Sequence, residues 1–532
     1  MPSILKKLWP LLVVIALLVY LTGGLITDSV RRNGGRFVYA LDDPYIHMAI
    51  AKNFALHGVW GVTAEGFTSS TSAPLWTLIL AIAYRLFGVN DLTPLILNML
   101  AALALLTLAY FIFTRYTQRS WLICLLLVVV LYTTPLPAQT LAGMEHLLHV
   151  VISIGFSFIA TQVITQPQPL TFKRWLPLLI LAPILSATRY EGLFLIGAAG
   201  LLLLVQRKFV PAIGIGLAGL MPPVAYGWIS ATRGWMFLPN SLMLKSAAIY
   251  SPPGERFSMV FDKLVERAGQ NSAVISLVLL SLVFWILLSN RPGTHLAQTL
   301  NTLFALTSLI HLVFADLGWF YRYEAYLMPL GLLAIGVSLA GLLPAGKLKI
   351  HWNSGSTYAG ALLGLTLVLV FWGRSGQSLR DTVTATANIH EQQIQMAKFV
   401  ARYYSGKAIA ANDIGALSYY TDAHVLDLFG LGSVEPARLK LQGRYDTLQI
   451  ARLVREKDVQ VVMVYDTWFE EFGGLPPAWR KVGEWEIQNN VVCGSPAVSF
   501  YAPNDAVLPY LRDSLNEFSA QLPQNVKFWS LK

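Results

Sequence analysis

Two neighbouring carboxylates, Asp42 and Asp43, follow the first apolar run of this 532-residue chain. An outward-facing aspartate can remove a proton from a hydroxyl nucleophile, so either residue is a candidate general base. Paired carboxylates can also hold a hard cation such as Mg²⁺ or Mn²⁺ beside a phosphate. Pro44 comes next, and because proline suits the first turn of a helix, Asp43 is equally well placed to cap a helix there. The pair predicts either an acid–base site with a candidate metal, or a helix cap with a spare acid.

Other polar residues stand in the loops between the apolar runs or where later apolar runs begin or end. They are His47, Glu145, His146, Arg189, Glu191, Asn240, Lys245, Tyr321 and Arg322. Charged groups at the edge of an apolar bundle are costly, which makes them candidates for a functional site. Cationic side chains beside an aspartate would suit an anionic substrate such as a phosphate. The alternative is mutual ion pairing, for example of Arg189 with Glu145.

A row of hydroxyl-bearing residues, 68–72, precedes an apolar stretch. Such hydroxyls can bind the polar groups of a substrate, or they can form a turn and a helix cap. The stretch that follows, 73–88, contains Arg85. We expect it to be a helix that lies in the membrane interface rather than a further crossing.

The elements that position these residues are mainly apolar. Hydrophobic residues make up 55% of the chain and charged residues 13%, with a mean hydropathy of +0.54, whereas soluble domains carry about 25% charged residues. This composition excludes an ordinary soluble enzyme, a disordered protein and a disulfide scaffold. Eleven membrane-spanning helices are predicted, from the apolar runs 8–26, 93–114, 121–139, 146–165, 175–188, 192–206, 210–230, 272–289, 297–317, 324–343 and 356–373.

Charge predicts how these helices are oriented. Basic residues fall in the short loops on one side, and the acids of residues 1–373 fall on the other side. Because basic loops stay in the cytoplasm, the N-terminus is predicted to be cytoplasmic, with the first run as a signal anchor, and the carboxylate pair extracytoplasmic. Arg31, Arg32 and Arg36 are the exception, since they follow the first helix on the outer side. The net charge of +10 belongs to this membrane half, so no nucleic-acid partner is expected.

The segment 175–206 is interrupted by a charged turn at 188–192. A single helix would bury two charges at mid-membrane, which is costly. Two short helices are therefore expected, with the charged turn reaching a cavity.

Beyond residue 373 the composition becomes that of a soluble α/β region. Strands are predicted at 407–412, 424–427, 459–465 and 491–501, and helices at 415–420 and 447–457. No glycine-rich nucleotide-binding motif is present. Two domains are expected: a transmembrane catalytic module, 1–373, with a large first outer loop, 28–92, and a soluble α/β extracytoplasmic domain, 374–532.

The ordered set of motifs resembles the GT-C class of integral membrane glycosyltransferases. It is most similar to the membrane arabinofuranosyltransferases, which use polyprenyl-phosphate sugars, and to their uncharacterised bacterial relatives. The matching motifs are Asp42-Asp43 with Tyr45-Ile46, residues 65–76, 143–145, 189–192 and 239–241, Lys245, Arg322-Tyr323, and residues 412–431. The resemblance spans nearly the whole chain and implies a GT-C-like helical fold.

The resemblance also implies a reaction. A pentosyl or hexosyl group passes, with inversion, from a polyprenyl-phosphate donor to an extracytoplasmic hydroxyl of a cell-envelope glycan, lipid or protein. Asp42 matches the catalytic base and Asp43 its acidic neighbour, while Lys245 and Arg322 match contacts to the donor phosphate. The setting would be the bacterial inner membrane, and a divalent cation is the one candidate cofactor. Arg189-Tyr190-Glu191 stands where relatives often have Arg-Pro-Glu, which leaves the sugar open.

Two other functions remain open from the sequence. Many crossings and a broken helix would also suit a membrane transporter, although the chain has no internal repeat. A non-catalytic envelope-assembly protein with an outer binding domain is the third class, but it would not require carboxylates and cations gathered on one face.

Overall fold

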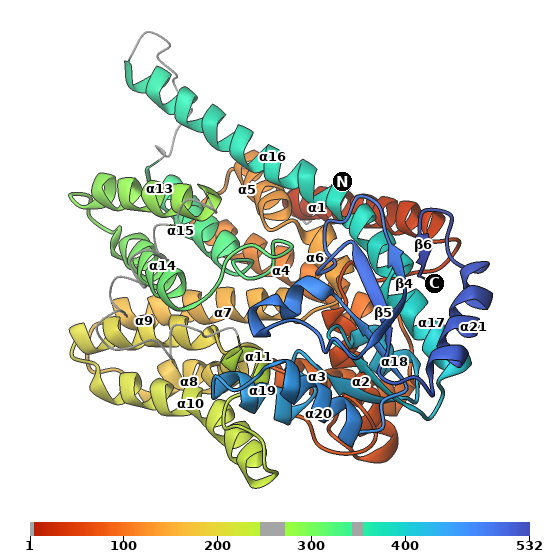
Figure 1. Ribbon diagram of the computed structural model, residues 1–532. Coiled ribbons are helices and arrows are strands. Elements are labelled where there is room, and N and C mark those ends of the chain that lie inside the picture. The colour runs from red at the N-terminus through yellow and green to blue at the C-terminus, as the bar shows by residue number, and fades with distance from the viewer. Residues whose placement is uncertain (1–4, 245–265, 267–271, 343–354, 532) are drawn as a thin grey trace.

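The computed structural model describes residues 5–244, 266, 272–342 and 355–531. Apolar helices pack side by side and form the left and middle of the view in Figure 1, from which α1, in red, extends to the right. They are α1 (Leu5–Arg32), α4 (Thr93–Tyr116), α5 (Ser120–Thr133), α6 (Leu136–Ala142), α7 (His146–Thr165), α8 (Phe172–Thr188), α9 (Gly192–Val205), α10 (Phe209–Thr232), α13 (Ser272–Leu288), α14 (His295–Phe314) and α15 (Leu327–Leu342). A longer helix, α16 (Gly355–Glu391), leads out of this bundle.

Six stretches of the described residues are long and apolar enough to cross a membrane. They are Lys7–Arg32, Thr93–Tyr116, Ser120–Ala142, His146–Thr165, Phe209–Thr232 and His295–Phe314. Helices α9, α13 and α15 are apolar but shorter, with 14, 17 and 16 residues. The fold is therefore that of a polytopic helical membrane protein, and the number of eleven crossings stays a prediction.

The expected break in the segment 175–206 is present, because α8 ends at Thr188 and α9 begins at Gly192. Gly192 packs against the end of α8: a β-carbon on it would lie 2.7 Å from Leu185 Cγ and 2.8 Å from the Leu185 carbonyl oxygen. This close approach lets the chain turn sharply and leaves Arg189 on the turn.

Two further helices follow α1 and lie against each other. They are α2 (Asp43–His57) and α3 (Pro74–Phe87). The helix predicted at 73–88 is thus present, and its position in the interface stays a prediction. Helix α2 begins at Asp43 with Asp42 at its N-cap position, and no side chain caps it. The expectation that Asp43 caps this helix is therefore wrong.

A six-stranded mixed sheet occupies the C-terminal part, drawn in blue in Figure 1, in the order β2-β1-β3-β5-β4-β6. Strands β2 (His424–Asp427), β1 (Ala408–Ala411) and β3 (Val461–Val464) run parallel, with Ala410 opposite Leu426 and Val462. Antiparallel pairing adds β5 (Ala497–Ala502), β4 (Arg480–Glu486) and β6 (Lys527–Ser530). The flanking helices are α11 (Asn240–Met243), α17 (Gln393–Tyr403), α18 (Gly415–Tyr420), α19 (Val434–Leu441), α20 (Thr447–Glu456), η2 (Asp466–Phe472) and α21 (Leu508–Ser519).

The sequence located β1, β2, β3, α18 and α20 but not the whole sheet. The strand predicted at 491–501 is wrong in its first half, because β5 begins at Ala497. The residues before it form a turn in which the Asn490 side chain accepts hydrogen bonds from the backbone N–H groups of Val492 and Cys493. Strands β4 and β6 and helix α21 were not predicted.

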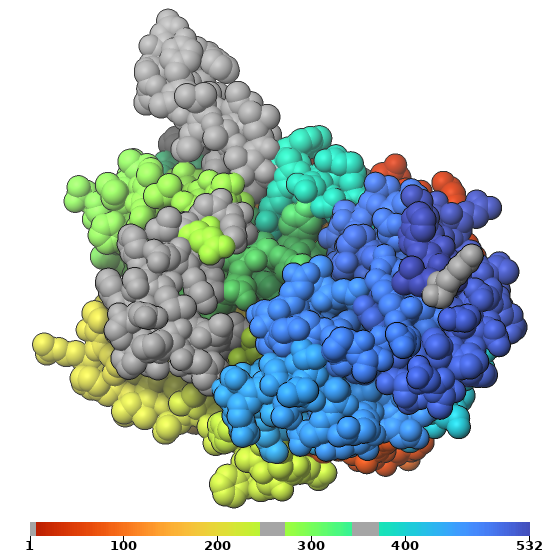
Figure 2. Space-filling model, viewed as in Figure 1, coloured from red at the N-terminus to blue at the C-terminus, as the bar shows by residue number. Residues whose placement is uncertain are grey.

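The segment between α1 and α3 and the C-terminal region share one apolar core, which includes residues from Val38 to Val62 and from Ala385 to Val526. The expected domain boundary after residue 373 falls inside α16, a continuous helix of 37 residues. Figure 2 shows the blue C-terminal atoms as one body beside the yellow and green helices. The shared core and the continuous helix both indicate that this segment and the C-terminal region fold together. The division into two domains stays a prediction.

Candidate active site

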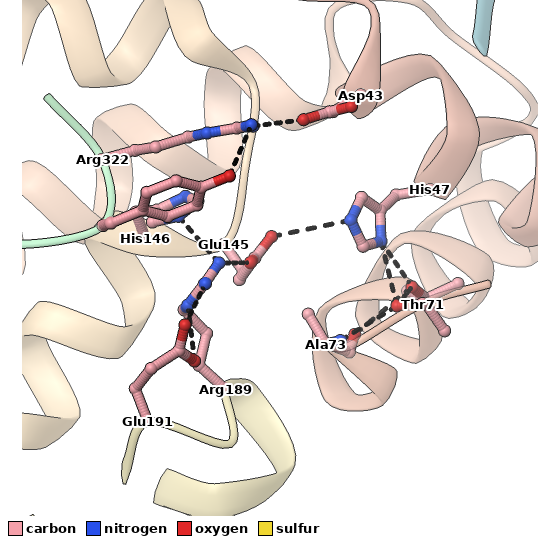
Figure 3. Close-up of polar contacts among 11 residues, drawn as sticks. Asp43, His47, Thr71, Ala73, Glu145, His146, Arg189, Glu191 and Arg322 are labelled. Atoms are coloured by element: carbon pink, nitrogen blue, oxygen red, sulfur yellow. Dashed lines mark hydrogen bonds and ion pairs between the residues drawn. The ribbon is translucent and has the colours of Figure 1, made fainter. Parts of the chain in front are cut away.

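A polar pocket lies where the start of α2, the hydroxyl row, the α8–α9 turn and the loop before α15 meet (Figure 3). Its walls also include a residue of the C-terminal region. The lining residues are Asp43, Ile46, His47, Ser70, Ser72, Met144, Arg189, Ser241, Arg322, Tyr323 and Leu431. Four of the side chains predicted from the sequence, Asp43, His47, Arg189 and Arg322, are thus brought together.

Asp43 and Arg322 form an ion pair in this pocket, with 2.5 Å between Asp43 Oδ2 and Arg322 Nη1. The Arg322 side chain is 2% exposed and the Asp43 side chain 35%, so the carboxylate remains accessible from outside. Arg322 Nη2 donates to the Tyr323 hydroxyl at 3.5 Å, and the guanidinium lies 5.1 Å from the centre of that ring. Its Nε has no hydrogen-bond partner among the described residues. The pocket therefore places a carboxylate beside a guanidinium, one N–H group of which has no hydrogen-bond partner among the described residues.

The loop that presents Arg322 has an unusual backbone. Gly318, Trp319, Phe320 and Tyr321 all have positive φ, at 79°, 39°, 61° and 62°. This region is unfavourable for residues other than glycine, and such conformations concentrate at functional sites. Glu324 anchors the loop, since it accepts the Gly318 N–H at 2.8 Å and pairs with Arg374.

Arg189 is held by carboxylates on two sides. It pairs with Glu145 and forms a two-bond contact with Glu191, at 2.5 and 3.1 Å, and its Nη1 lies 2.7 Å from His146 Nε2. Figure 3 shows Arg189 between the two glutamates. Mutual ion pairing, the alternative left open by the sequence, is therefore what the structure shows for Arg189. The guanidinium still lines the pocket.

His47 links this network to the hydroxyl row. Its Nε2 lies 3.7 Å from Glu145 Oε2, and its Nδ1 lies 2.9 Å from the Thr77 hydroxyl. Burial lowers the pKa of His47, and the Glu145 carboxylate opposes that shift only in part. A neutral His47 is thus fixed by hydrogen bonds on the pocket wall.

Asp42 points away from the pocket and into the C-terminal region. Its carboxylate accepts the backbone N–H groups of Gly415 at 2.5 Å and Ala416 at 2.8 Å, and so caps α18. A β-carbon on Gly415 would lie 2.2 Å from the Asp42 carbonyl oxygen, so only glycine permits this approach. Burial, and then the charge of Asp413 beside it, raises the pKa of Asp42. Asp42 is not among the residues that line the pocket.

The two neighbouring carboxylates do not fit a shared cation. Asp42 faces the N-terminus of α18, whereas Asp43 faces Arg322. Within the described ranges, no group of three or more His, Cys, Asp and Glu side chains is arranged to hold a metal ion. The expected Mg²⁺ or Mn²⁺ site at the pair therefore has no support in the geometry.

Two of the remaining predicted residues, Tyr321 and Asn240, are direct neighbours in the sequence of the pocket residues Arg322 and Ser241. The Tyr321 hydroxyl donates to Asp381 at 3.0 Å, and Tyr321 does not line the pocket. Asn240 donates from Nδ2 to the Gly430 carbonyl at 2.7 Å and so holds the loop that carries Leu431. Lys245 lies outside the described residues.

The hydroxyl row divides between the two functions considered for it. The Thr71 hydroxyl accepts the Ala73 N–H at 3.0 Å, Thr68 accepts the Val62 N–H at 3.1 Å, and both contacts shape the turn. Ser70 and Ser72 line the pocket, and the Ser70 hydroxyl has no partner among the described residues. The row is therefore partly a turn and partly pocket wall.

Sequence reasoning did not place Tyr323, Ser241 or Leu431 at the site. Tyr323 directly follows the predicted residue Arg322, and this adjacency in the sequence was the available signal. Leu431 reaches the pocket from the C-terminal region, and its place in the motif 412–431 was the only hint. Its contact with the pocket depends on tertiary folding.

Comparisons with known proteins give a family model and a set of similar structures. Residues 387–501 match a model described as a domain of unknown function, DUF8728. No curated protein matches the chain. The crystal structure of ArnT from Cupriavidus metallidurans bound to undecaprenyl phosphate is similar with a TM-score of 0.52 and 12% identity, over 92% of this chain and 99% of that chain.

The apo structure of the same ArnT gives a TM-score of 0.50 and 11% identity, over 92% of this chain and 98% of that chain. The Archaeoglobus fulgidus oligosaccharyltransferase complex with Zn and sulfate gives 0.45 and 9% identity, over 95% of this chain and 74% of that chain. A special relation to arabinofuranosyltransferases is not among these findings. The chain thus shares its fold with ArnT.

Proposed function

We propose that this chain is a GT-C-type membrane glycosyltransferase that takes a sugar from a polyprenyl-phosphate donor. The observation that carries the proposal is the pair of Asp43 and Arg322 in one pocket beside the apolar helices. A carboxylate can accept the acceptor's proton, and an arginine suits a phosphate. The fold supports the same conclusion, because the similar ArnT structure is bound to undecaprenyl phosphate.

In the proposed reaction Asp43 is the general base. The acceptor hydroxyl gives its proton to Asp43 as its oxygen attacks the anomeric carbon of the donor sugar. The bond between that carbon and the phosphate oxygen breaks, and its electron pair leaves with the lipid phosphate. The sugar is transferred with inversion, to an envelope glycan, lipid or protein on the outer side.

Arg322 acts on the leaving phosphate and also controls the base. Charge develops on the phosphate as the bond breaks, and a preorganised guanidinium stabilises it. Arg322 pairs with Asp43 at 2.5 Å. A bound phosphate would compete for the guanidinium and weaken its pairing with Asp43, which makes the Asp43 carboxylate a better proton acceptor. The base would thus become available when the donor is in place.

This proposal exchanges the roles that the resemblance gives to the two aspartates. Asp42 is buried, with its carboxylate engaged by two backbone N–H groups of α18. Asp43 lies on the pocket and is partly exposed. Arg189 is neutralised by Glu145 and Glu191, so we give it a positioning role on the pocket wall. The expected phosphate contact of Lys245 stays a prediction.

The test is donor turnover by the full chain in lipid nanodiscs. Matched polyprenyl-phosphate pentose and hexose donors, labelled in the lipid, are incubated with a cell-envelope extract as acceptor. We expect polyprenyl phosphate to be released from one of the lipid-linked donors. The nucleoside diphosphate derivative of the same sugar should not react. Failure of every lipid-linked donor, or turnover of the nucleotide sugar, contradicts the proposal. Passage of the intact donor across the bilayer without release would indicate the transporter alternative.

A further inference from the structure

A second polar pocket lies away from Asp43, at the C-terminal end of α1. The junction of α16 with α17 and the loop that joins α21 to β6 form its other walls. Five basic side chains line it: Arg31, Arg32, Arg36, His390 and Lys398. The three arginines are those whose position on the outer side departs from the usual distribution of positive charge.

Acidic partners do not balance this charge. Arg31 lies 3.6 Å from Asp28, and both side chains are largely exposed. Glu391 is the acid that lines the pocket; it accepts a hydrogen bond from Asn525 at 3.1 Å and interacts electrostatically with Arg32, so it offsets one of the positive charges. Among the described residues, no carboxylate lies within ion-pairing distance of Arg32, Arg36 or Lys398. The pocket thus carries an excess of positive charge.

The basic groups destabilise one another in their charged forms. Burial, and then Arg36, lowers the pKa of Lys398. Burial, followed by Lys398 and Arg36, lowers the pKa of His390 to about 4. Like charges held together in this way are unfavourable unless an anion sits between them.

Asn33 gives an independent indication of a missing partner. Its side chain is fully buried and lines the same pocket. Neither Nδ2 nor Oδ1 has a hydrogen-bond partner among the described residues. Buried amides are nearly always hydrogen-bonded, so an unpaired one calls for an explanation. A ligand with acceptor oxygens would engage Nδ2.

A simpler explanation covers only part of the cluster. Basic residues in the last turn of a helix stabilise its negative end, which would account for Arg31 and Arg32 in α1. Arg36 lies beyond the helix, however, and Lys398 comes from α17. Charge from three separate segments converges on one cavity, and the helix dipole does not require that.

We propose that this pocket binds the phosphate group of an anionic lipid headgroup. Arginine side chains recognise phosphate through several charge-assisted hydrogen bonds. The pocket lies at the end of α1, an apolar helix of membrane-spanning length, so a headgroup is within reach. Basic clusters beside such a helix attract anionic lipids. The proposal does not depend on the function assigned to the Asp43 pocket.

The experiment uses the full chain in neutral detergent and follows its melting temperature. Phosphatidylglycerol, phosphatidylcholine and inorganic phosphate are titrated separately, because a ligand that binds the folded state stabilises it by mass action. We expect phosphatidylglycerol to raise the melting temperature far more than the other two. The double variant Arg36→Gln/Lys398→Gln should bind phosphatidylglycerol roughly ten-fold more weakly or worse, whereas Arg291→Gln, an exposed arginine elsewhere, should bind it as the wild type does.

The variants also separate loss of a site from loss of folding. Without lipid, the double variant should melt no lower than the wild type, because it removes like charges. Asn33→Asp places a carboxylate among the cations, so it should raise the melting temperature without lipid and abolish the lipid response. Equal shifts with phosphatidylcholine, the same shift with inorganic phosphate alone, or an unchanged response in the double variant would each overturn the proposal.

Discussion

Asp42 and Asp43 are neighbours in the chain, yet their carboxylates serve different parts of the molecule. Asp43→Asn keeps the side-chain shape but cannot accept a proton, and general-base catalysis is worth roughly 10²–10⁴-fold in rate. We expect transfer per folded molecule to fall by that factor, and the melting temperature to fall as well, because Arg322, which is 2% exposed, loses its ion-pair partner. Donor turnover and thermal unfolding of the same preparation are the two measurements.

Asp42→Asn is the matched control for that substitution. An asparagine cannot accept both N–H groups of α18, so stability should fall, by about 1 kcal/mol for a lost cap, while turnover per folded molecule persists. An inactive Asp42→Asn protein with normal stability, beside an active Asp43→Asn protein, would restore Asp42 as the base.

The buried carboxyls of Asp42 and Asp413 make stability depend on pH. Burial raises the pKa of both groups, and for Asp42 the charge of Asp413 adds to the shift. The folded chain therefore holds more protons than the unfolded chain at pH values above the ordinary aspartate pKa. Stability is greatest below that pKa and falls as pH rises through the raised one.

Asp413→Asn should remove part of this pH dependence, because it deletes one of the two groups and the charge beside Asp42, whereas burial still raises the pKa of Asp42. The asparagine oxygen can still accept from Gln393, whose Nε2 lies 2.9 Å from Asp413 Oδ2. The melting temperature of the wild type should decline between mildly acidic and alkaline pH, and that of the variant should decline less, because burial still acts on Asp42. A wild-type melting temperature that rises over this interval would contradict the assignment.

At the scale of an element, the α8–α9 turn depends on its ion pairs. Arg189→Gln leaves two carboxylates, Glu145 and Glu191, without their cation, whereas Glu145→Gln leaves Arg189 paired with Glu191. Removing one partner of a buried pair costs about 3–5 kcal/mol. Arg189→Gln should therefore lower stability by that amount and Glu145→Gln by less. Equal losses in thermal unfolding would show that Glu191 does not hold Arg189 alone.

The same turn requires a glycine at its end. A β-carbon at Gly192 would meet Leu185 at 2.7 Å, whereas one at Gly197, in the same helix, would meet nothing within 4 Å. Overpacking of this kind costs about 1–3 kcal/mol. Gly192→Ala should therefore lower the melting temperature and the activity, and Gly197→Ala should leave both unchanged or raise stability. A neutral Gly192→Ala would show that the helices separate easily.

At the scale of the whole molecule, the orientation in the membrane can be tested by labelling. Cys124 and Cys493 are first replaced, and single cysteines are then introduced as Leu448→Cys and Arg207→Cys. Leu448 lies in the C-terminal region and is 77% exposed, and Arg207 is exposed between α9 and α10. An impermeant thiol reagent added to intact cells should label position 448 and not position 207. The reverse pattern would place the Asp43 pocket in the cytoplasm and exclude an extracytoplasmic acceptor.

The sequence by itself determined the features that depend on local interactions. A long apolar run forms a helix in lipid whatever its neighbours are, so the helices that contain these runs were predictable. The charged residues at 188–192 likewise indicated that the helix is interrupted there. Strands β1 and β3 lie inside the sheet and have continuous apolar character, so their sequences alone identify them as strands, whereas β2 is an edge strand with a short apolar centre.

Only the tertiary structure decided which aspartate faces the pocket. The partners of Asp42 are the N–H groups of α18, 373 and 374 residues away in the chain, and no spacing near Asp42 reveals them. Strand β6 was not predicted for a related reason. It is an edge strand with largely exposed side chains, so its pairing with β4 rather than its composition makes it a strand. Leu431 meets Arg322 at the pocket in the same way. Local physics sets the helices, whereas long-range packing selects the side chains that meet at the site.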